Sequence, residues 1–234
     1  MISKLILFDI DKTLINKIII YKNPWKIAMR DVFNIEEPNG LKGVETHGKT
    51  MRWLSIEDLR NHNISEKVIF NKLDLFLEKL SDVYFEVLED GEVIVFNGIK
   101  KLLDTLSYNN FNLGLITGNT KKIAFNKLKK GQIDNFFEIG GFGEESEFRD
   151  DLVKISIDNS EKKFKKKFKK KFKNLDIYVI GDTPLDITSA KKFNLQTIGV
   201  TTGIYSKIDL KKVGADFVLN NLENIDTILS IISK

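Results

Sequence analysis

The sequence contains no cysteine, only two histidines and no long uninterrupted apolar run. The absence of cysteine excludes disulfides, thiolate metal sites and cysteine nucleophiles, so any chemistry must use oxygen and nitrogen groups. No apolar run approaches the roughly 18 residues that a membrane helix needs. Asp9 and Asp11 also interrupt the apolar N-terminal stretch before it could form the core of a signal peptide. We therefore expect a cytoplasmic protein with no membrane partner.

The composition is typical of a folded globular protein. Of the 234 residues, 42% are hydrophobic and 30% are charged, which suits one large domain or one domain with a sizeable insertion. The formal net charge is +4, but residues 162–173 alone hold nine lysines and no acid. The rest of the chain carries 28 basic and 33 acidic side chains, a net charge of −5, so the global charge says little about partners.

The lysine-rich tract at residues 162–173 repeats a four-residue unit, which places Phe164, Phe168 and Phe172 on one stripe of a helix. One interpretation is a patch that binds nucleic acid or another anionic surface. The other is a helix extension with solvated lysines and phenylalanines that pack on the sheet. We favour the second, because the tract has no arginine and no polar side chain that reads bases, and so do not expect nucleic acid as a partner.

Short apolar runs alternate with helical patterns along most of the chain, which predicts a parallel sheet covered by helices on both faces. The expected strands are residues 3–10, 111–117, 136–140, 176–181, 196–200 and 216–219. The segment 16–95 breaks this alternation with helical patterns at 25–33, 50–59 and 64–88, the last of which fits one long helix or two shorter ones. The predicted fold class is α/β, with a Rossmann-like three-layer core formed by residues 1–15 and 96–234 and a small helical domain inserted at 16–95.

Two acidic residues, Asp9 and Asp11, lie directly at the end of the first expected strand. Ligands of open α/β sheets bind beyond the carboxyl ends of the strands, so both carboxylates lie where chemistry is expected. Two acids this close repel each other unless a cation or a proton separates them, which makes a purely structural role costly.

A second acidic site follows the expected strand at 176–181. Asp182 comes directly after it, Pro184 suits the first turn of a following helix, and Asp186 lies early in that helix. Taken alone, a helix-capping role for Asp182 or Thr183 explains this segment equally well. Together with Asp9, Asp182 forms an all-oxygen site at one edge of the sheet, and such a site suits Mg²⁺.

A third strand end carries Thr117, Gly118 and Asn119, just before a helical pattern. A hydroxyl and free backbone N–H groups at a helix N-terminus can cradle a phosphate, although capping is the simpler explanation for this segment alone. Further along the chain, Arg149 lies at the start of a helix and Lys154 five residues later. Either cation could neutralise charge on a phosphoryl group.

Both histidines lie in the helical insertion, and neither can complete a Ser-His-Asp triad with an evident nucleophile elbow. His47 stands between Thr46 and Gly48, where substrate contact and an exposed loop position explain it equally well. His62 lies between two asparagines and is expected in a turn.

The sequence resembles the haloacid dehalogenase-like hydrolase superfamily, in its phosphoglycolate-phosphatase-like branch. The four motifs of that family are similar, in order, to Asp9-x-Asp11-x-Thr13-Leu14, Thr117, Arg149 or Lys154, and Gly181-Asp182-Thr183-Pro184-x-Asp186. Order and spacing agree over essentially the whole chain, and the inserted helices stand where the family has its cap domain. The chain departs from the family in the first motif, where Lys12 replaces a common glycine, and in the third, which lacks the usual Lys-Pro.

The resemblance implies a mechanism of phosphoryl transfer. Asp9 would attack the substrate phosphorus to form an aspartyl-phosphate, while Asp11 would protonate the leaving oxygen and later activate water. Mg²⁺ would be held by the Asp9 side chain, the backbone carbonyl of Asp11 and Asp182. Asp186 would support the waters on the metal or the cation of the third motif.

The same resemblance assigns the phosphate-binding groups. Thr117 and the N–H groups of Gly118 and Asn119 would grip the phosphoryl oxygens. Arg149 is preferred as the cation of the third motif because it stands at the helix start, and Lys154 is the alternative.

The expected function is therefore a Mg²⁺-dependent phosphatase that acts on a small phosphorylated metabolite. Dehalogenases and phosphonatases resemble this chain elsewhere but lack an acid at the position of Asp11, which disfavours those activities. A sugar phosphomutase would use the same residues but return the phosphoryl group to a second hydroxyl. A third alternative is a module without enzymatic activity that binds anionic partners through the lysine-rich tract.

Overall fold

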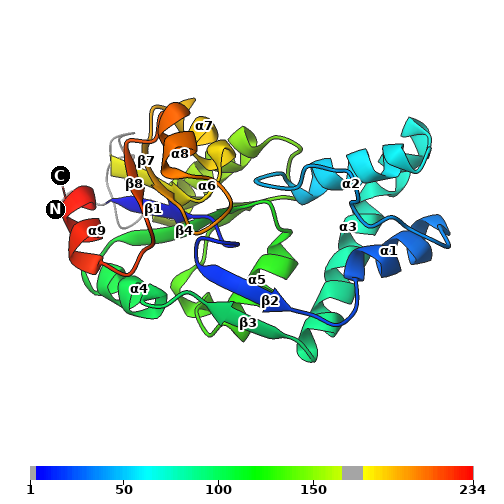
Figure 1. The fold of residues 1–234 in the computed structure, drawn as a ribbon, viewed down its shortest axis with the longest axis horizontal. Coiled ribbons are helices and arrows are strands. Elements are labelled where there is room, and N and C mark those ends of the chain that lie inside the picture. Colours follow the sequence, from blue (N-terminus) through cyan, green and yellow to red (C-terminus); the bar gives the residue numbers. More distant parts are fainter. Residues whose placement is uncertain (1–3, 165–175, 234) are drawn as a thin grey trace.

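The computed structural model of the chain describes residues 4–164 and 176–233. It confirms the predicted α/β class, with a six-stranded parallel sheet covered by helices (Figure 1). Residues 165–173 of the lysine-rich tract lie outside the described residues, and so does the interpretation of the tract as a helix extension. Within the described part of the chain, no helix is long and apolar enough to cross a membrane.

All neighbouring strands of the main sheet are parallel. The strands are β1 (Leu5–Phe8), β4 (Asn112–Thr117), β5 (Gly140–Phe142), β6 (Ile177–Gly181), β7 (Gln196–Val200) and β8 (Phe217–Leu219). Side by side they run in the order β5-β4-β1-β6-β7-β8, so the chain builds the sheet outward from β1 in both directions. The order reverses between β1 and β6, and ligands of doubly wound sheets bind at this reversal.

The strand expected at residues 136–140 is wrong in position. Strand β5 begins only at Gly140, and Asp134–Phe136 form a short 3₁₀ helix, η1. Phe137 accounts for part of the apolar pattern. It lies in the connection between η1 and β5, and its side chain is buried with its ring centroid 6.1 Å from that of Phe8. A loop that fills the core gives the same apolar run in the sequence as a buried strand.

Two layers of helices enclose the sheet. The first is formed by α4 (Ile99–Tyr108), α5 (Lys121–Lys130) and α9 (Ile225–Ile232), and the second by α6 (Arg149–Phe164) and α7 (Pro184–Lys191), beside which α8 (Lys207–Lys212) packs. Side chains of β1 alternate between the layers, since Ile6 and Phe8 face the first and Leu5 and Leu7 the second. Because β1 is buried on both sides, the residues that follow it start from a fixed position.

Three helices lie together at one end of the molecule, to the right in Figure 1. They are α1 (Pro24–Phe33), α2 (Met51–Asn61) and α3 (Glu66–Glu89), close to the three predicted ranges. Their buried side chains form a second cluster, which Ile123 of α5 also joins and in which the rings of Trp25 and Phe76 meet edge-on at 5.5 Å. The side chain of Thr50 caps α2 by accepting from the backbone N–H of Trp53, which fixes where the preceding loop ends.

The sequence did not predict a second, two-stranded sheet. Strands β2 (Ile15–Ile19) and β3 (Glu92–Val95) pair antiparallel at the two ends of the segment that holds α1, α2 and α3. Each strand is short and partly exposed, and β2 includes Asn16 and Lys17, so its apolar pattern is weak. The pairing brings the entry and the exit of the helical segment together.

Candidate active site

A pocket of about 300 Å³ opens beyond the carboxyl ends of β1, β4 and β6, at the reversal of strand order. Most of its polar side chains come from the core, and they include those of Asp9, Asp11, Thr117, Asn119, Lys127, Arg149 and Asp182. The helical segment contributes its loop before α2 and the first residues of that helix. Residues from separate stretches of the sequence thus enclose one small space.

Asp9 is held at the end of β1 and is only 7% exposed. Its backbone N–H donates to the carbonyl of Ile180 at 2.9 Å, which extends the pairing of β1 with β6 by one residue. Its carboxylate Oδ1 accepts from Nη2 of Arg149 at 2.7 Å. The same nitrogen donates to Oδ1 of Asp186 at 2.5 Å, so one buried guanidinium joins two buried carboxylates.

The carboxylates of Asp9, Asp182 and Asp186 converge, with one oxygen of each within 4.8 Å of the others. All three are buried, and Arg149 supplies one positive charge against their three negative charges. Burial raises the pKa of Asp9 to about 7 despite the nearby guanidinium, and burial beside Asp9 raises the pKa of Asp182 to about 8. An all-oxygen cluster with this excess of negative charge fits a hard divalent cation.

Asp186 owes its position to the start of α7. The hydroxyl of Thr183 caps this helix by accepting from the backbone N–H of Asp186, and Asp186 Oδ2 accepts in return from the backbone N–H and hydroxyl of Thr183, at 2.9 and 2.7 Å. This capping box occupies one oxygen, and Arg149 occupies the other. Thr183 is thus the helix cap, which leaves the carboxylate of Asp182 available at the pocket.

Asp11 lies at the pocket with its side chain 42% exposed. Its two oxygens lie 3.0 and 2.7 Å from Nζ of Lys127, and Oδ2 also accepts from the amide of Asn119 at 2.7 Å. Burial alone would raise the pKa of Asp11, but the ammonium of Lys127 and the Asn119 hydrogen bond outweigh it and hold that pKa below its usual value. The pKa values of the two carboxylates of the first motif are therefore shifted in opposite directions.

Thr117 is fully buried at the end of β4. Its Oγ1 accepts from the backbone N–H and the side-chain amide of Asn119, at 3.2 and 2.8 Å, which leaves the hydroxyl hydrogen to donate elsewhere. Gly118 permits a close approach of the helical segment, because a Cβ at this position would lie 2.1 Å from the carbonyl oxygen of Lys49. The carbonyl of Gly118 accepts from the backbone N–H of Met51 at 2.8 Å.

The loop before α2 closes the pocket from the side of the helical segment. Its carbonyl at Gly48 accepts from Nη1 of Arg149 at 3.1 Å. His47 also lines the pocket, and its Nδ1 lies 2.7 Å from the carboxylate of Glu45, while its ring meets that of Tyr205 edge-on. His62 is placed differently, at the end of α2 as the sequence predicts, where its Nε2 accepts from the backbone of Asn39.

The two candidate cations of the third motif have different positions. Arg149 is buried in the pocket, whereas Lys154 is exposed on α6 and does not line it. Five residues turn an α-helix by about 140° beyond a full circle, so the two side chains leave α6 in different directions. Lys154 therefore lies apart from the other predicted site residues.

Lys127 is the pocket residue that sequence reasoning missed. The sequence held one indication that Lys127 is buried. This lysine lies four residues after Ile123 and one before Leu128, two apolar residues that are buried on α5. A lysine on the apolar side of a helix needs a buried partner, and its partner Asp11 is 116 positions away in the sequence.

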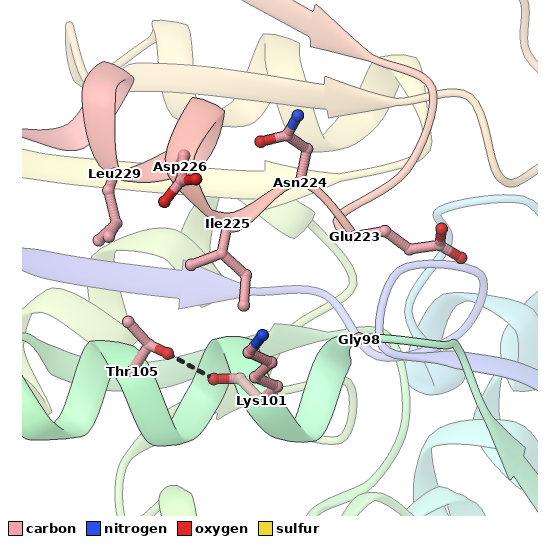
Figure 2. A pocket seen from close by; sticks show the side chains of 8 residues that line it. All are labelled: Gly98, Lys101, Thr105, Glu223, Asn224, Ile225, Asp226 and Leu229. Atoms are coloured by element: carbon pink, nitrogen blue, oxygen red, sulfur yellow. Dashed lines mark hydrogen bonds between the residues drawn. The ribbon is translucent and has the colours of Figure 1, made fainter.

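A second hollow, of about 620 Å³, lies between α4 and the start of α9 (Figure 2). Lys101 and Thr105 come from α4, while Glu223, Asn224 and Asp226 come from the other side. The side chain of Thr105 donates to the backbone of its own helix, and the four other residues are exposed. This hollow contains none of the predicted site residues and no buried charged group.

Comparison with known proteins agrees with this architecture. A sequence model of the family described as haloacid dehalogenase-like hydrolase matches residues 6–200. No curated protein matches the chain.

Several solved structures share the fold at low sequence identity. A predicted phosphatase from Clostridium acetobutylicum is 21% identical with a TM-score of 0.64, and the match covers 98% of this chain and 100% of that one. A predicted phosphoglycolate phosphatase from Haemophilus somnus is 20% identical with a TM-score of 0.65, covering 97% of both chains. A candidate β-phosphoglucomutase from Bacteroides vulgatus is 14% identical with a TM-score of 0.64, covering 99% of this chain and 89% of the other.

Proposed function

The chain belongs to the haloacid dehalogenase-like hydrolase family, and on that premise we propose that it is a phosphatase that hydrolyses a small phosphomonoester at the pocket beyond β1. The observation that carries this proposal is that the two carboxylates have different partners and different exposure to solvent. Asp9 contacts Arg149 in a buried acidic cluster, while Asp11 is partly exposed and contacts Lys127. A buried carboxylate and a partly exposed one suit two different roles. The pKa of Asp11 is low in the free protein, and a phosphoryl anion bound beside it would raise that pKa, so that Asp11 can carry the proton it donates.

Asp9 is the proposed nucleophile. In the first half-reaction its carboxylate oxygen bonds to phosphorus, the bond from phosphorus to the leaving oxygen breaks, and that oxygen takes a proton from the carboxyl group of Asp11. In the second, water attacks phosphorus and gives a proton to Asp11, and the bond between Asp9 and phosphorus breaks. Inorganic phosphate leaves, and both aspartates return to their starting states.

The phosphoryl group is proposed to bind between Thr117 and Arg149. Oγ1 of Thr117 accepts in both of its hydrogen bonds with Asn119. Its own hydrogen can therefore donate to a phosphoryl oxygen. Nε of Arg149 is buried and, within the described part of the chain, has no hydrogen-bond partner. Buried donors without partners are costly, and an anionic ligand would satisfy both. Backbone N–H groups at Gly118 and Asn119 complete the proposed cradle, and Lys154 is not part of it.

Mg²⁺ is the proposed metal. Asp9, Asp182 and the backbone carbonyl of Asp11 would hold it, and Asp186 would act from outside because both its oxygens already have partners. When bound, the ion would offset the repulsion between the carboxylate of Asp9 and the incoming phosphate. Asp182 contributes to the site by placing a second buried carboxylate beside Asp9.

The helical segment at residues 16–95 is proposed to be a cap domain over the core of residues 1–15 and 96–234. Its loop at Gly48 already contacts Arg149, so substrate entry requires the segment to move away and return. The pocket of about 300 Å³ suits a small metabolite, and phosphoglycolate is the first substrate to try. The protein is proposed to act in the cytoplasm.

The proposal is tested by phosphate release from a panel of small phosphomonoesters, with Mg²⁺, with a chelator, and with the Asp9→Asn variant. We expect release by the wild-type protein that requires the metal and is lost in the variant, while circular dichroism shows both folded. A phosphomutase would instead convert one phosphate isomer of a sugar into another and release little phosphate. Absence of both reactions in folded, metal-loaded protein would contradict the proposal and favour a binding role.

A further inference from the structure

Lys127 is a buried lysine that neither the family motifs nor the proposed chemistry assigns. It is 5% exposed and lies one turn after Ile123, on the side of α5 that packs against α3 of the helical segment. A buried ammonium is costly unless it is paired and its hydrogens are bonded. Its surroundings therefore indicate what it does.

The ammonium of Lys127 has three oxygen partners. They are Oδ1 and Oδ2 of Asp11, at 3.0 and 2.7 Å, and Oδ1 of Asn119 at 2.7 Å. The ring of Tyr84, from α3, covers the remaining side at 5.4 Å. An ammonium has three hydrogens, so these contacts leave none for a substrate. Lys127 is consequently suited to position another residue.

Asn119 completes a triangle with Lys127 and Asp11. Its amide nitrogen donates to Asp11 Oδ2 and to Thr117 Oγ1, while its amide oxygen accepts from Lys127. Asp11 has a partly exposed side chain and is followed by Lys12 in a left-handed backbone conformation, in the turn that leaves β1. Within the described residues, Lys127 and Asn119 supply the hydrogen bonds that fix the direction of its carboxylate.

We propose that Lys127 is a positioning residue, which together with Asn119 aims the carboxylate of Asp11 at the leaving oxygen and later at the attacking water. This inference rests on the proposed phosphatase function. Asp9 needs no contact with Lys127 to attack phosphorus, since its own buried partner is Arg149. Removal of Lys127 should therefore harm the proton transfers and spare the attack by Asp9.

Leaving groups of different quality separate these two effects. In p-nitrophenyl phosphate the leaving group departs without a proton, whereas an alkyl phosphate needs one. With enzyme in excess, the first turnover measures release of the leaving group alone. For Lys127→Met we expect this rate to fall about 100-fold with the alkyl ester, the order of general acid catalysis, and less than about threefold with p-nitrophenyl phosphate.

Two further variants make the test specific. Lys122→Met removes another lysine of α5, one that pairs with Asp82 at the surface, and should leave both rates unchanged. Lys127→Arg keeps a cation beside Asp11 and should restore part of the alkyl ester rate. Equal losses with both esters, or no loss with either, would overturn the positioning role. If the wild-type protein releases neither leaving group, the proposed phosphatase function fails, and the role of Lys127 fails with it.

If Lys127→Met does not fold, Lys127→Arg decides alone. A selective loss with the alkyl ester supports the proposal, because an arginine cannot reproduce the three short contacts of the ammonium. Equal rate losses with the alkyl ester and p-nitrophenyl phosphate, or no loss with either, overturn the proposal.

Discussion

Arg149 donates to Asp9 across 2.7 Å and thereby joins the start of α6 to the end of β1 inside the protein. The same guanidinium reaches Asp186 on α7 and the carbonyl of Gly48 in the helical segment. One side chain thus connects the proposed nucleophile, the acidic cluster and the loop that closes the pocket. Its planar, forked guanidinium carries five N–H donors, so it can keep these contacts and still have donors left for a ligand.

Replacing Arg149 tests this connection. Arg149→Lys should lower kcat/KM by about 100-fold or more, because the three hydrogens of an ammonium cannot serve both carboxylates, the carbonyl of Gly48 and the phosphoryl group together. Arg149→Met should also destabilise the fold by about 3–5 kcal/mol, since it leaves buried carboxylates without their partner. Steady-state kinetics and thermal unfolding measure the two effects. Lys154→Met is the matched control on α6, and a similar loss in that variant would contradict the assignment of the cation.

The acidic cluster predicts how stability depends on pH when no metal is bound. The pKa values of Asp9 and Asp182 are raised in the folded protein to about 7 and about 8, from 3.8. Between about pH 4 and pH 8 the folded state therefore binds more protons than the unfolded state, and its stability falls as pH rises. Denaturant unfolding in chelator should show this decline.

A bound divalent cation should remove most of that pH dependence, because it stabilises the ionised carboxylates. Repeating the unfolding series with Mg²⁺ should raise stability most at the alkaline end of the range. The Asp182→Asn variant should show a weaker decline in chelator and a smaller response to Mg²⁺. Stability that rises with pH in the metal-free protein would contradict the raised pKa values.

The close contact at Gly118 predicts a different kind of defect. In Gly118→Ala the added Cβ would lie 2.1 Å from the carbonyl oxygen of Lys49, so the helical segment and the core must move apart. We expect a destabilisation of about 1–3 kcal/mol, as for other overpacked sites, together with a higher KM. Thermal unfolding and kinetics measure both quantities. Unchanged values for both would mean that this contact does not form in solution.

The strand ends could be predicted from the sequence because they depend on local patterns. Asp9, Thr117 and Asp182 each follow a short apolar run, and parallel strands bring such positions to one edge of a sheet. That part of the arrangement needs no knowledge of distant contacts.

The remaining features depend on contacts between distant residues. The choice between Arg149 and Lys154 depends on which side of α6 faces the sheet, and the helix pattern alone did not decide it. Lys127, on α5, could not be assigned because its partner Asp11 follows β1, 116 positions earlier in the sequence. The pair of strands β2 and β3 could not be predicted for a similar reason. Each is stabilised by pairing with the other, and the whole helical segment separates them in the sequence.

The most direct measurement is a search for phosphate bound covalently to Asp9. Asp11→Asn protein is mixed with p-nitrophenyl phosphate and Mg²⁺, quenched in acid, digested and examined by peptide mass spectrometry. The first half-reaction should proceed without a proton from residue 11, and the second should stall, so phosphate should accumulate on Asp9. An unmodified Asp9 in this variant, while the wild-type protein hydrolyses the same ester, would contradict the proposed aspartyl-phosphate mechanism.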